Sequence, residues 1–284
     1  MNSSFDDANP RKYRADMHTH TDSSPDSECD INDLCRAQIE KGISTFAITD
    51  HFNIEIKGLE VDIETPIVSS YKKATDAAEK YSGKIEVLRG IEVGAAMWDK
   101  ELAEQMLKRF DFDVVIGSVH TVYTDEVKTY YSQVDFSTLT SVAIDKFMTA
   151  YFDELLNTAL YCDFDILAHL TCPVRYINGK YNLGFDISKY EEVIREILSV
   201  VIKRDKALEV NTSNCSFSDG FFMPDSKILS IYKEMGGSLL TMGSDAHVAQ
   251  NSAIAFDEAE QMLTNLGFSE LCVFRKRCPF AYPI

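Results

Sequence analysis

The chain has 284 residues, of which 45% are hydrophobic and 26% are charged, as in ordinary globular proteins. Its net charge of −17 argues against binding nucleic acid through general electrostatics, because that mode needs a basic face. No run of about 18 apolar residues is present to span a membrane, and seven scattered cysteines without a Cys-x-x-Cys pair predict reduced thiols in a cytoplasmic protein.

Short apolar runs alternate with amphipathic segments of helix length, which predicts a parallel α/β architecture. The predicted strands cover 14–18, 45–49, 85–91, 114–119, 164–168, 207–211 and 238–243. The predicted helices cover 31–41, 67–82, 99–110, 140–161, 187–204, 225–235 and 255–266. Residues 273–276 are either a last short strand or a tail. No linker or repeat interrupts the pattern, so we expect one domain over residues 1–284, and seven strands suggest a barrel one unit short of eight.

A polar or metal-binding side chain follows every predicted strand. The first strand ends in His18 and His20, and the last is followed by Asp245 and His247. Residues two apart on a strand point to the same side, so each pair aims two ligand atoms at one point. The strands between them end in Asp50 and His51, Glu92, His120, His169 and Asn211. Because active sites of parallel α/β barrels lie at the carboxyl ends of the strands, we expect these residues to meet there.

All six histidines of the chain fall at these strand ends, and none lies on a predicted helix face. One histidine alone is more often structural, but a random scatter would not give this set. Imidazoles combined with carboxylates, without clustered thiolates, suit Zn, Mn or Fe. The sequence therefore predicts a metal site built from both ends of the chain.

Six motifs resemble, in order, those of the PHP (polymerase and histidinol phosphatase) superfamily. They are His18-x-His20, Thr49-Asp50-His51, Gly90-Ile91-Glu92, Ser118-Val119-His120, Ala168-His169-Leu170 and Gly243-Ser244-Asp245-Ala246-His247. The resemblance runs from about residue 14 to about residue 250. It is closest to the monofunctional histidinol-phosphate phosphatase branch, because of the Asn211-Thr212-Ser213 stretch and the segment lengths between motifs. It implies a distorted (β/α)7 TIM-like barrel with a trinuclear metal site.

Carried over residue by residue, the resemblance implies nine ligands for three divalent ions, which would be Zn, Mn or Fe. The first ion would take His18, His20, Glu92 and Asp245, the second would share Glu92 and take His120 and His169, and the third would take Asp26, His51 and His247. Some family members have a histidine at the position of Asp26, and the alternative for Asp26 is an ordinary loop carboxylate. Three dications against three ligand carboxylates leave a positive pocket suited to phosphate.

Two further residues are candidate substrate contacts. Arg175, six residues after His169, resembles the family's phosphate-gripping arginine, although a surface role is the alternative. Asn211 would either hydrogen-bond the substrate or cap its own loop. We expect in-line attack on phosphorus without a phosphoenzyme. The catalytic candidates are Glu92, Asp245 and His247, and Asp245, His247 or a metal-bound water would protonate the leaving group.

The chain departs from the histidinol phosphatase pattern after Asn211. Family members usually continue with a glycine and a nearby arginine, whereas this chain reads Asn214-Cys215-Ser216-Phe217-Ser218-Asp219-Gly220. No arginine occurs between Arg204 and Arg275, so a second phosphate clamp would be missing or supplied by Lys227. The long segment 121–139, which contains four aromatic residues, is either a lid over the substrate or an inert surface excursion.

These interpretations favour a cytoplasmic, metal-dependent phosphomonoesterase that hydrolyses L-histidinol phosphate to L-histidinol and phosphate in histidine biosynthesis. The altered loop keeps open a PHP phosphoesterase acting on another small ester, such as a nucleotide or sugar phosphate. A non-catalytic PHP module is the third hypothesis, and the complete ligand set stands against it. The expected partner is a small phosphorylated substrate, with neither nucleic acid nor membrane, and the sequence does not give the oligomeric state.

Overall fold

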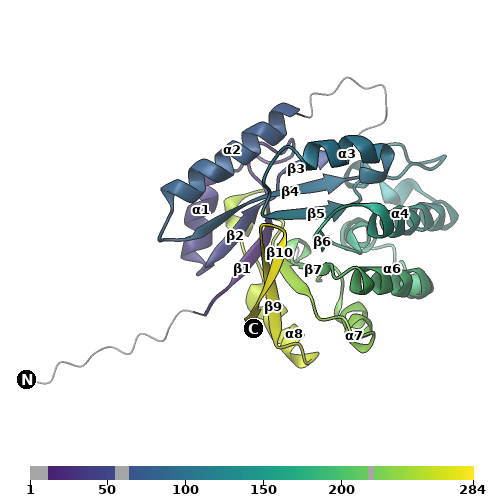
Figure 1. Ribbon diagram of the computed structural model, residues 1–284. Helices are drawn as coiled ribbons and strands as arrows, with labels where there is room; N and C mark the ends of the chain where they lie inside the picture. Colours follow the sequence, from purple (N-terminus) through teal and green to yellow (C-terminus); the bar gives the residue numbers. More distant parts are fainter. Residues whose placement is uncertain (1–11, 55–63, 217–220) are drawn as a thin grey trace, which may run out of the picture.

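The structure is a computed structural model, and it describes residues 12–54, 64–216 and 221–284 (Figure 1). Its main sheet is parallel and follows the order β1-β2-β4-β5-β6-β7-β8, with β3 paired to β4. These strands are β1 (Ala15–Thr19), β2 (Thr45–Ile48), β3 (His51–Asn53), β4 (Glu86–Gly94), β5 (Val114–Ser118), β6 (Ile166–Leu167), β7 (Ala207–Asn211) and β8 (Leu240–Gly243).

The sheet curls until its first and last strands meet at their carboxyl ends. The Asp245 amide donates to the His18 carbonyl at 2.8 Å, and the His20 amide donates to the Ala246 carbonyl at 3.0 Å. Both bonds join β1 to the residues that follow β8. The predicted distorted (β/α)7 barrel is therefore confirmed, and its closure lies beside the two ligand pairs at the chain ends.

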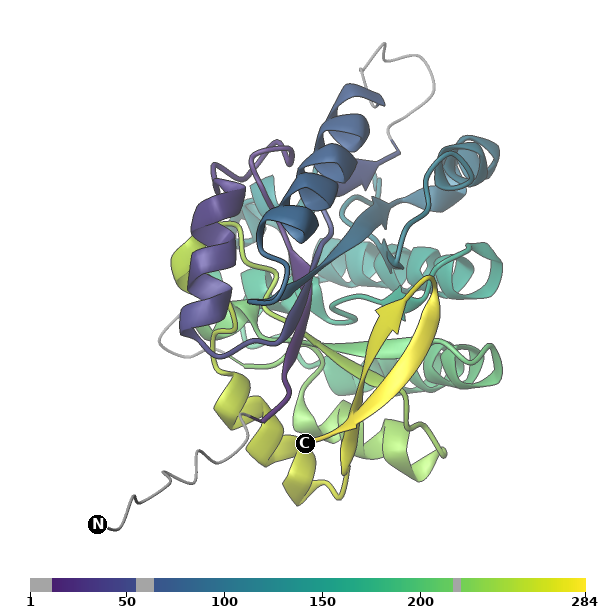
Figure 2. The same cartoon turned by 60° about the vertical axis from the view of Figure 1, so that its left-hand side comes forward.

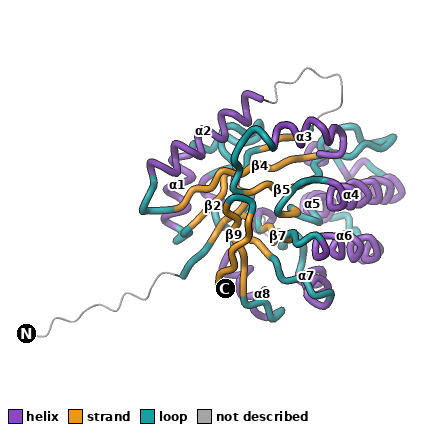
Figure 3. The backbone as a smooth tube through the Cα atoms, viewed as in Figure 1, coloured by secondary structure: helices purple, strands orange, loops and turns teal. Residues whose placement is uncertain are grey.

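Helices surround this central sheet, as the purple coils around the orange strands show in Figure 3. They are α1 (Ile31–Glu40), α2 (Glu64–Lys80), α3 (Lys100–Leu107), α4 (Ser141–Tyr161), α5 (Cys172–Val174), α6 (Glu191–Lys203), α7 (Ser226–Glu234) and α8 (Phe256–Asn265). All seven predicted strands and seven predicted helices are present, with ends shifted by no more than four residues. Among the described residues, no helix is long and apolar enough to cross a membrane. That residues 1–284 form a single domain stays a prediction.

A short strand that the sequence did not predict, β3, follows β2 after a break at Thr49 and Asp50. It pairs with the second half of β4, and its first residue, His51, lies opposite Glu92. The break thus places an imidazole directly beside the buried carboxylate of the next strand.

The chain ends in an antiparallel hairpin of β9 (Glu270–Arg275) and β10 (Cys278–Pro283), yellow in Figure 2. Its basic residues pair with carboxylates at the starts of the barrel strands. Arg275 Nε donates to Glu86 at 2.7 Å, and Arg277 pairs with Asp163 and Asp165. The hairpin therefore closes the amino-terminal end of the barrel, opposite the strand ends that carry the histidines.

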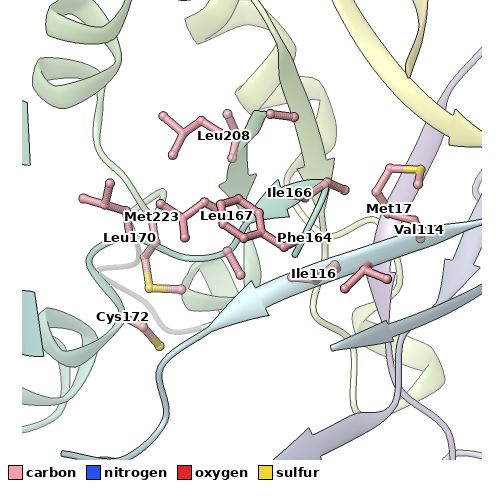
Figure 4. Close-up of a cluster of buried hydrophobic side chains, with 14 of the residues drawn as sticks. Met17, Val114, Ile116, Phe164, Ile166, Leu167, Leu170, Cys172, Leu208 and Met223 are labelled. Carbon is pink, nitrogen blue, oxygen red and sulfur yellow. The ribbon is translucent and has the colours of Figure 1, made fainter. Parts of the chain in front are cut away.

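Phe164 is one of the fully buried side chains of the core and lies among Ile116, Ile166 and Leu167 (Figure 4). Its ring occupies space left by Gly117 on β5, since a Cβ built on that glycine would lie 3.0 Å from the Phe164 Cγ. The ring therefore packs directly against the barrel backbone.

Phe164→Ala is expected to lower the free energy of unfolding by about 3–5 kcal/mol, because it removes a buried ring and leaves a cavity. Urea unfolding followed by circular dichroism measures the loss. Phe280→Ala is the matched control, since the Phe280 side chain is 49% exposed, and it is expected to change stability by no more than about 0.5 kcal/mol. Equal losses in the two variants would contradict this account of the core.

Candidate metal centre

The carboxyl ends of the strands open into a cavity of about 350 Å³. Its described lining residues are Pro25, Asp26, His51, Asn53, His120, Tyr130, Tyr131, Ser132, Gln133, His169, Cys172, Arg175, Tyr176, Asp245 and His247. His18, His20 and Glu92 are fully buried and contact the ligand atoms of this lining. The strand-end residues of both chain ends therefore meet, as the sequence predicts.

Four ligand atoms at the floor of the cavity surround one point. His18 Nε2 lies 3.3 Å from Glu92 Oε2 and 3.7 Å from Asp245 Oδ1. His20 Nε2 lies 3.6 Å and 3.2 Å from the same two oxygens. Zinc–ligand bonds of about 2.0–2.2 Å place tetrahedral donor atoms about 3.4 Å apart, so this spacing fits a metal ion.

The other oxygen of Glu92 faces a second set of donors. Glu92 Oε1 lies 3.1 Å from His120 Nε2 and 3.0 Å from His169 Nε2, and the two imidazole nitrogens are 3.4 Å apart. The carboxylate of Glu92 thus stands between two groups of imidazoles, with one oxygen directed at each group.

A third set lies nearer the mouth of the cavity. His51 Nε2 and His247 Nε2 are 3.4 Å apart, and each lies 3.4 Å from one oxygen of Asp26. The Asp26 side chain is 60% exposed, whereas the side chains of the first set are almost fully buried. These distances bring the nine predicted ligands together and are compatible with three sets, although His20 also groups with His51 and His247, and His18 with His169 and Asp245. The assignment of the ligands to three ions stays a prediction.

The sets also overlap, because the nine side chains crowd one small volume. His51 Nδ1 lies 2.8 Å from Glu92 Oε2, and His51, Glu92 and His120 bring donor atoms within 4.8 Å of one another. Within the described part of the chain, His18 Nε2, His20 Nε2 and Glu92 Oε2 are buried and form no hydrogen bond of good geometry. Buried polar atoms are normally paired, so these unpaired, converging atoms fit a bound cation.

The most buried imidazoles are oriented from behind by hydrogen bonds. His18 Nδ1 lies 2.7 Å from Glu209 Oε1, and His20 Nδ1 lies 3.0 Å from Ser24 Oγ, which itself donates to Asp50 at 2.7 Å. A carboxylate, or a hydroxyl whose proton is already donated, can only accept, so both Nδ1 atoms carry the proton. The lone pair of each Nε2 then points into the first set.

Two imidazoles of the other sets are oriented in the same way. His120 Nδ1 donates to Asn53 Oδ1 at 2.9 Å, and His247 Nδ1 donates to the carbonyl of Asp245 at 3.0 Å. Both rings therefore turn a lone pair on Nε2 toward their set. Four of the six histidines thus hold the tautomer that binds a metal through Nε2.

The carboxylates of the centre are held ionised. Burial alone would raise the pKa of Glu92, but the neighbouring imidazoles of His120, His18 and His51 lower it well below its ordinary value. Burial likewise opposes a lowered pKa at Asp245, and His18, His20 and His247 outweigh it. A cluster of ionised carboxylates beside imidazole lone pairs is suited to divalent cations.

Metal uptake by the metal-free protein is expected to release protons and to strengthen as the pH rises from about 6 to 9. Burial lowers the pKa of His51, but Glu92 and Asp26 raise it to about 10, so its imidazole is protonated at neutral pH. A metal must displace that proton, which makes affinity rise by up to about tenfold per pH unit for each proton released. Calorimetric titration with Zn²⁺ in buffers of different ionisation enthalpy counts the protons, and affinity independent of pH would contradict this expectation.

Arg175 borders the cavity, as a phosphate contact must. Its Nη1 donates to Ser213 Oγ at 3.0 Å, and Ser213 Oγ lies 3.3 Å from Asp245 Oδ2. Lys227 does not provide a second clamp, because its Nζ lies 3.7 Å from Glu191 Oε2 and it is not among the described lining residues. Arg175 is the one arginine of that lining.

Asn211 is fully buried and does not border the cavity. Its Nδ2 donates to Asp245 Oδ2 at 3.3 Å and to Glu209 Oε2 at 3.1 Å, while its Oδ1 accepts from Ser213. These contacts support a role in holding Asp245 and its own loop rather than a direct substrate contact. Part of the altered segment that follows, residues 217–220, lies outside the described residues.

The segment 121–139 contributes part of the cavity wall. Tyr130, Tyr131, Ser132 and Gln133 line the cavity, and the segment is therefore not an inert surface excursion. Whether it closes over a substrate stays a prediction.

Two residues of the centre were missed by the sequence analysis. Glu209 orients His18, and Asn53 orients His120. A signal was present for Glu209, since it lies in a predicted buried strand two residues before Asn211 and so points to the same side. Asn53 carried no such signal, because the strand that holds it was not predicted.

Comparison with known proteins places this centre in a family. A model of the PHP domain matches residues 16–213. Histidinol-phosphatase from Lactococcus lactis is 26% identical, covering 92% of this chain and 94% of that protein, and a probable histidinol-phosphatase from Thermotoga maritima is 30% identical, covering 92% and 96%. The crystal structure of histidinol phosphate phosphatase from Lactococcus lactis, complexed with zinc, L-histidinol and phosphate, superposes with a TM-score of 0.74 at 22% identity, covering 94% and 98%. The family model spans well over half of the chain, and the chain therefore belongs to the PHP domain family.

Proposed function

We propose that the protein is a metal-dependent phosphomonoesterase that hydrolyses L-histidinol phosphate to L-histidinol and phosphate, a step of histidine biosynthesis. The observation that carries the proposal is the arrangement of six imidazoles and three carboxylates with metal-like spacing, beside Arg175 in one cavity. The substrate assignment is supported by the names of the relatives that align over most of the chain.

We further propose that the three sets hold three divalent ions. Zinc is the ion to test first, since it is present in the related Lactococcus structure, and Mn and Fe accept the same donors. Such ions, when bound, supply positive charge for the phosphoryl group and lower the pKa of bound water toward about 7. The ligands are His18, His20, Asp26, His51, Glu92, His120, His169, Asp245 and His247.

The chain's own residues would position the substrate. The Arg175 guanidinium would hold the phosphoryl oxygens, with Ser213 fixing its direction. Tyr130, Tyr131 and Tyr176 form an aromatic wall that excludes water around the organic part of the ester. The lowered pKa of Asp245 argues against that carboxyl as the proton donor to the leaving alkoxide, which leaves His247 or water.

A second candidate is a phosphoesterase acting on another small ester. One observation favours it. The described lining of the cavity holds a single arginine, Arg175, whereas histidinol phosphatases usually have a second arginine after the position of Asn211. A different substrate would then rely on other contacts away from the phosphate.

Phosphate release from L-histidinol phosphate, measured beside a panel of nucleotide and sugar phosphates, tests the proposal. The zinc-reconstituted protein is expected to prefer L-histidinol phosphate by more than tenfold in kcat/KM. A preference of that size for another ester would replace the substrate and keep the chemistry. Full metal content without hydrolysis of any ester would overturn the enzyme and support a non-catalytic module.

Asp26→Asn is expected to reduce the metal content from three ions to two per chain, because it removes the one carboxylate of the exposed third set. Plasma mass spectrometry after gel filtration measures the content. The matched control is Asp22→Asn, a neighbouring carboxylate that pairs with Lys73 instead. Three retained ions in Asp26→Asn would contradict the assignment of Asp26.

A further inference from the structure

We propose that Glu209 is a positioning residue of the metal centre, whose two carboxylate oxygens fix a ligand of the first set and the backbone of a ligand of the second. The inference rests on the proposed metal-binding function. It concerns a residue behind the ligands, so its test can fail while metal binding and hydrolysis themselves stand.

The contacts of Glu209 come from three different strand ends. Its Oε1 accepts from His18 Nδ1 at 2.7 Å, and its Oε2 accepts from the backbone amide of His169 at 2.7 Å and from Asn211 Nδ2 at 3.1 Å. Glu209 is 1% exposed. Each oxygen is thus tied to a different ligand of the centre.

Among the described residues, the ion-pair partner of Glu209 is an imidazole. Within the described ranges, no lysine or arginine forms an ion pair with it, and His18 is its one charged-type neighbour. A buried carboxylate is expensive unless a cation compensates it. A metal ion on the far nitrogen of His18 would provide that positive charge through the imidazole, an arrangement that recurs at histidine–metal sites.

The barrel leaves room for this carboxylate. Gly243 lies beside Asn211 across β7 and β8, and a Cβ built on it would lie 2.3 Å from Glu209 Oε1 and 2.6 Å from His18 Cβ. Any larger residue at this position would push the two partners apart. The glycine that opens the Gly243–His247 motif is therefore explained by the Glu209–His18 pair.

The second carboxylate oxygen of Glu209, Oε2, accepts a hydrogen bond from His169, whose backbone conformation is strained. His169 has a φ of 25°, in the left-handed region that residues other than glycine rarely adopt. The bond from its amide to Glu209 Oε2 stabilises this conformation, which directs the imidazole toward Glu92. Glu209 therefore supports both ligand sets from outside, while Glu92 joins them from inside.

Glu209→Gln separates positioning from packing, because glutamine has the same shape but only one acceptor oxygen. In either orientation its NH₂ group faces a donor, which is His18 Nδ1 or the His169 amide. The expected result is a loss of Zn²⁺ affinity of about 10- to 100-fold. This is the range typical when the hydrogen-bond partner of a metal-binding histidine is changed. Competition with a chromophoric chelator measures the affinity, and thermal unfolding of the metal-free protein measures packing.

The matched control is Glu260→Gln, a buried glutamate far from the centre that pairs with Lys12 and Arg14. It is expected to destabilise the metal-free protein at least as much as Glu209→Gln and to leave Zn²⁺ affinity within threefold. Glu209→Asp keeps the carboxylate on a side chain that is one methylene shorter, and its Zn²⁺ affinity is expected to be intermediate. This variant provides a second test if Glu209→Gln does not fold. Wild-type affinity in either Glu209 variant, or an equal affinity loss in Glu260→Gln, would overturn the proposal.

Discussion

Glu92→Gln is expected to lower kcat/KM for phosphate-ester hydrolysis by at least about three orders of magnitude. Glu92 directs one oxygen at His18 and His20 and the other at His120 and His169. An amide has a single oxygen, so in either orientation its NH₂ group faces imidazole lone pairs and one set loses its Glu92 oxygen. Metal ions stabilise phosphoryl transfer by several kcal/mol, and each 1.36 kcal/mol is about a tenfold change in rate.

The measurement combines metal content with steady-state kinetics on the same preparation. Glu86→Gln is the matched control, because Glu86 lies on the same strand, β4, at its opposite end and pairs with Arg275. It is expected to keep full metal content and at least half of the activity. Glu92→Gln protein with three ions and an activity loss below tenfold would show that Glu92 does not bridge the two sets.

The convergence of the candidate metal ligands could be predicted from the sequence because it follows from two simple regularities. Side chains two apart on a strand share a face, and parallel strands end at one edge of the barrel. These rules bring His18, His20 and Glu92 together without knowledge of any loop. The resemblance then divided the ligands into sets. The distances are compatible with that division, which stays a prediction because other groupings of the same donors are equally close.

The supporting layer could not be predicted in the same way, because it depends on which strands are neighbours and how far each is shifted. Glu209 reaches His18 only because β7 neighbours β8 and β8 meets β1 when the barrel closes. Likewise, β3 has no clear apolar pattern, and its pairing with β4 decides that Asn53 orients His120. Sequence periodicity carries no information on such partners.

The sequence named Arg175 and the segment 121–139 as candidates for the cavity wall, but it did not predict how they are placed. Tyr130 and Gln133 come from a long segment without regular periodicity, and Arg175 follows the short helix α5, which was not predicted. Such segments are placed by packing against the barrel rather than by local propensity. Substrate choice depends on this wall, and therefore the sequence specifies the reaction class more firmly than the substrate.

Arg175→Ala is expected to raise KM for phosphate esters by about two orders of magnitude and to change kcat much less. Within the described lining, Arg175 is the one guanidinium, and its Nη1 donates to Ser213 Oγ at 3.0 Å. A hydrogen bond between charged groups contributes about 1.5–3 kcal/mol. A contact made equally in the ground state and the transition state appears in KM rather than in kcat.

Arg175→Lys separates charge from geometry, since lysine keeps the positive charge but cannot form the two parallel bonds of the guanidinium fork. This variant is expected to recover only part of the lost substrate affinity. Binding of inorganic phosphate, measured as product inhibition, is expected to weaken by the same factor as binding of the substrate. Arg195→Ala, on the outer helix α6 where Arg195 pairs with Glu191, is the control and is expected to change neither constant. A change in KM of less than threefold in Arg175→Ala would contradict this role and would show that the metal centre alone holds the phosphate. The missing second arginine would then be no argument against L-histidinol phosphate as the substrate.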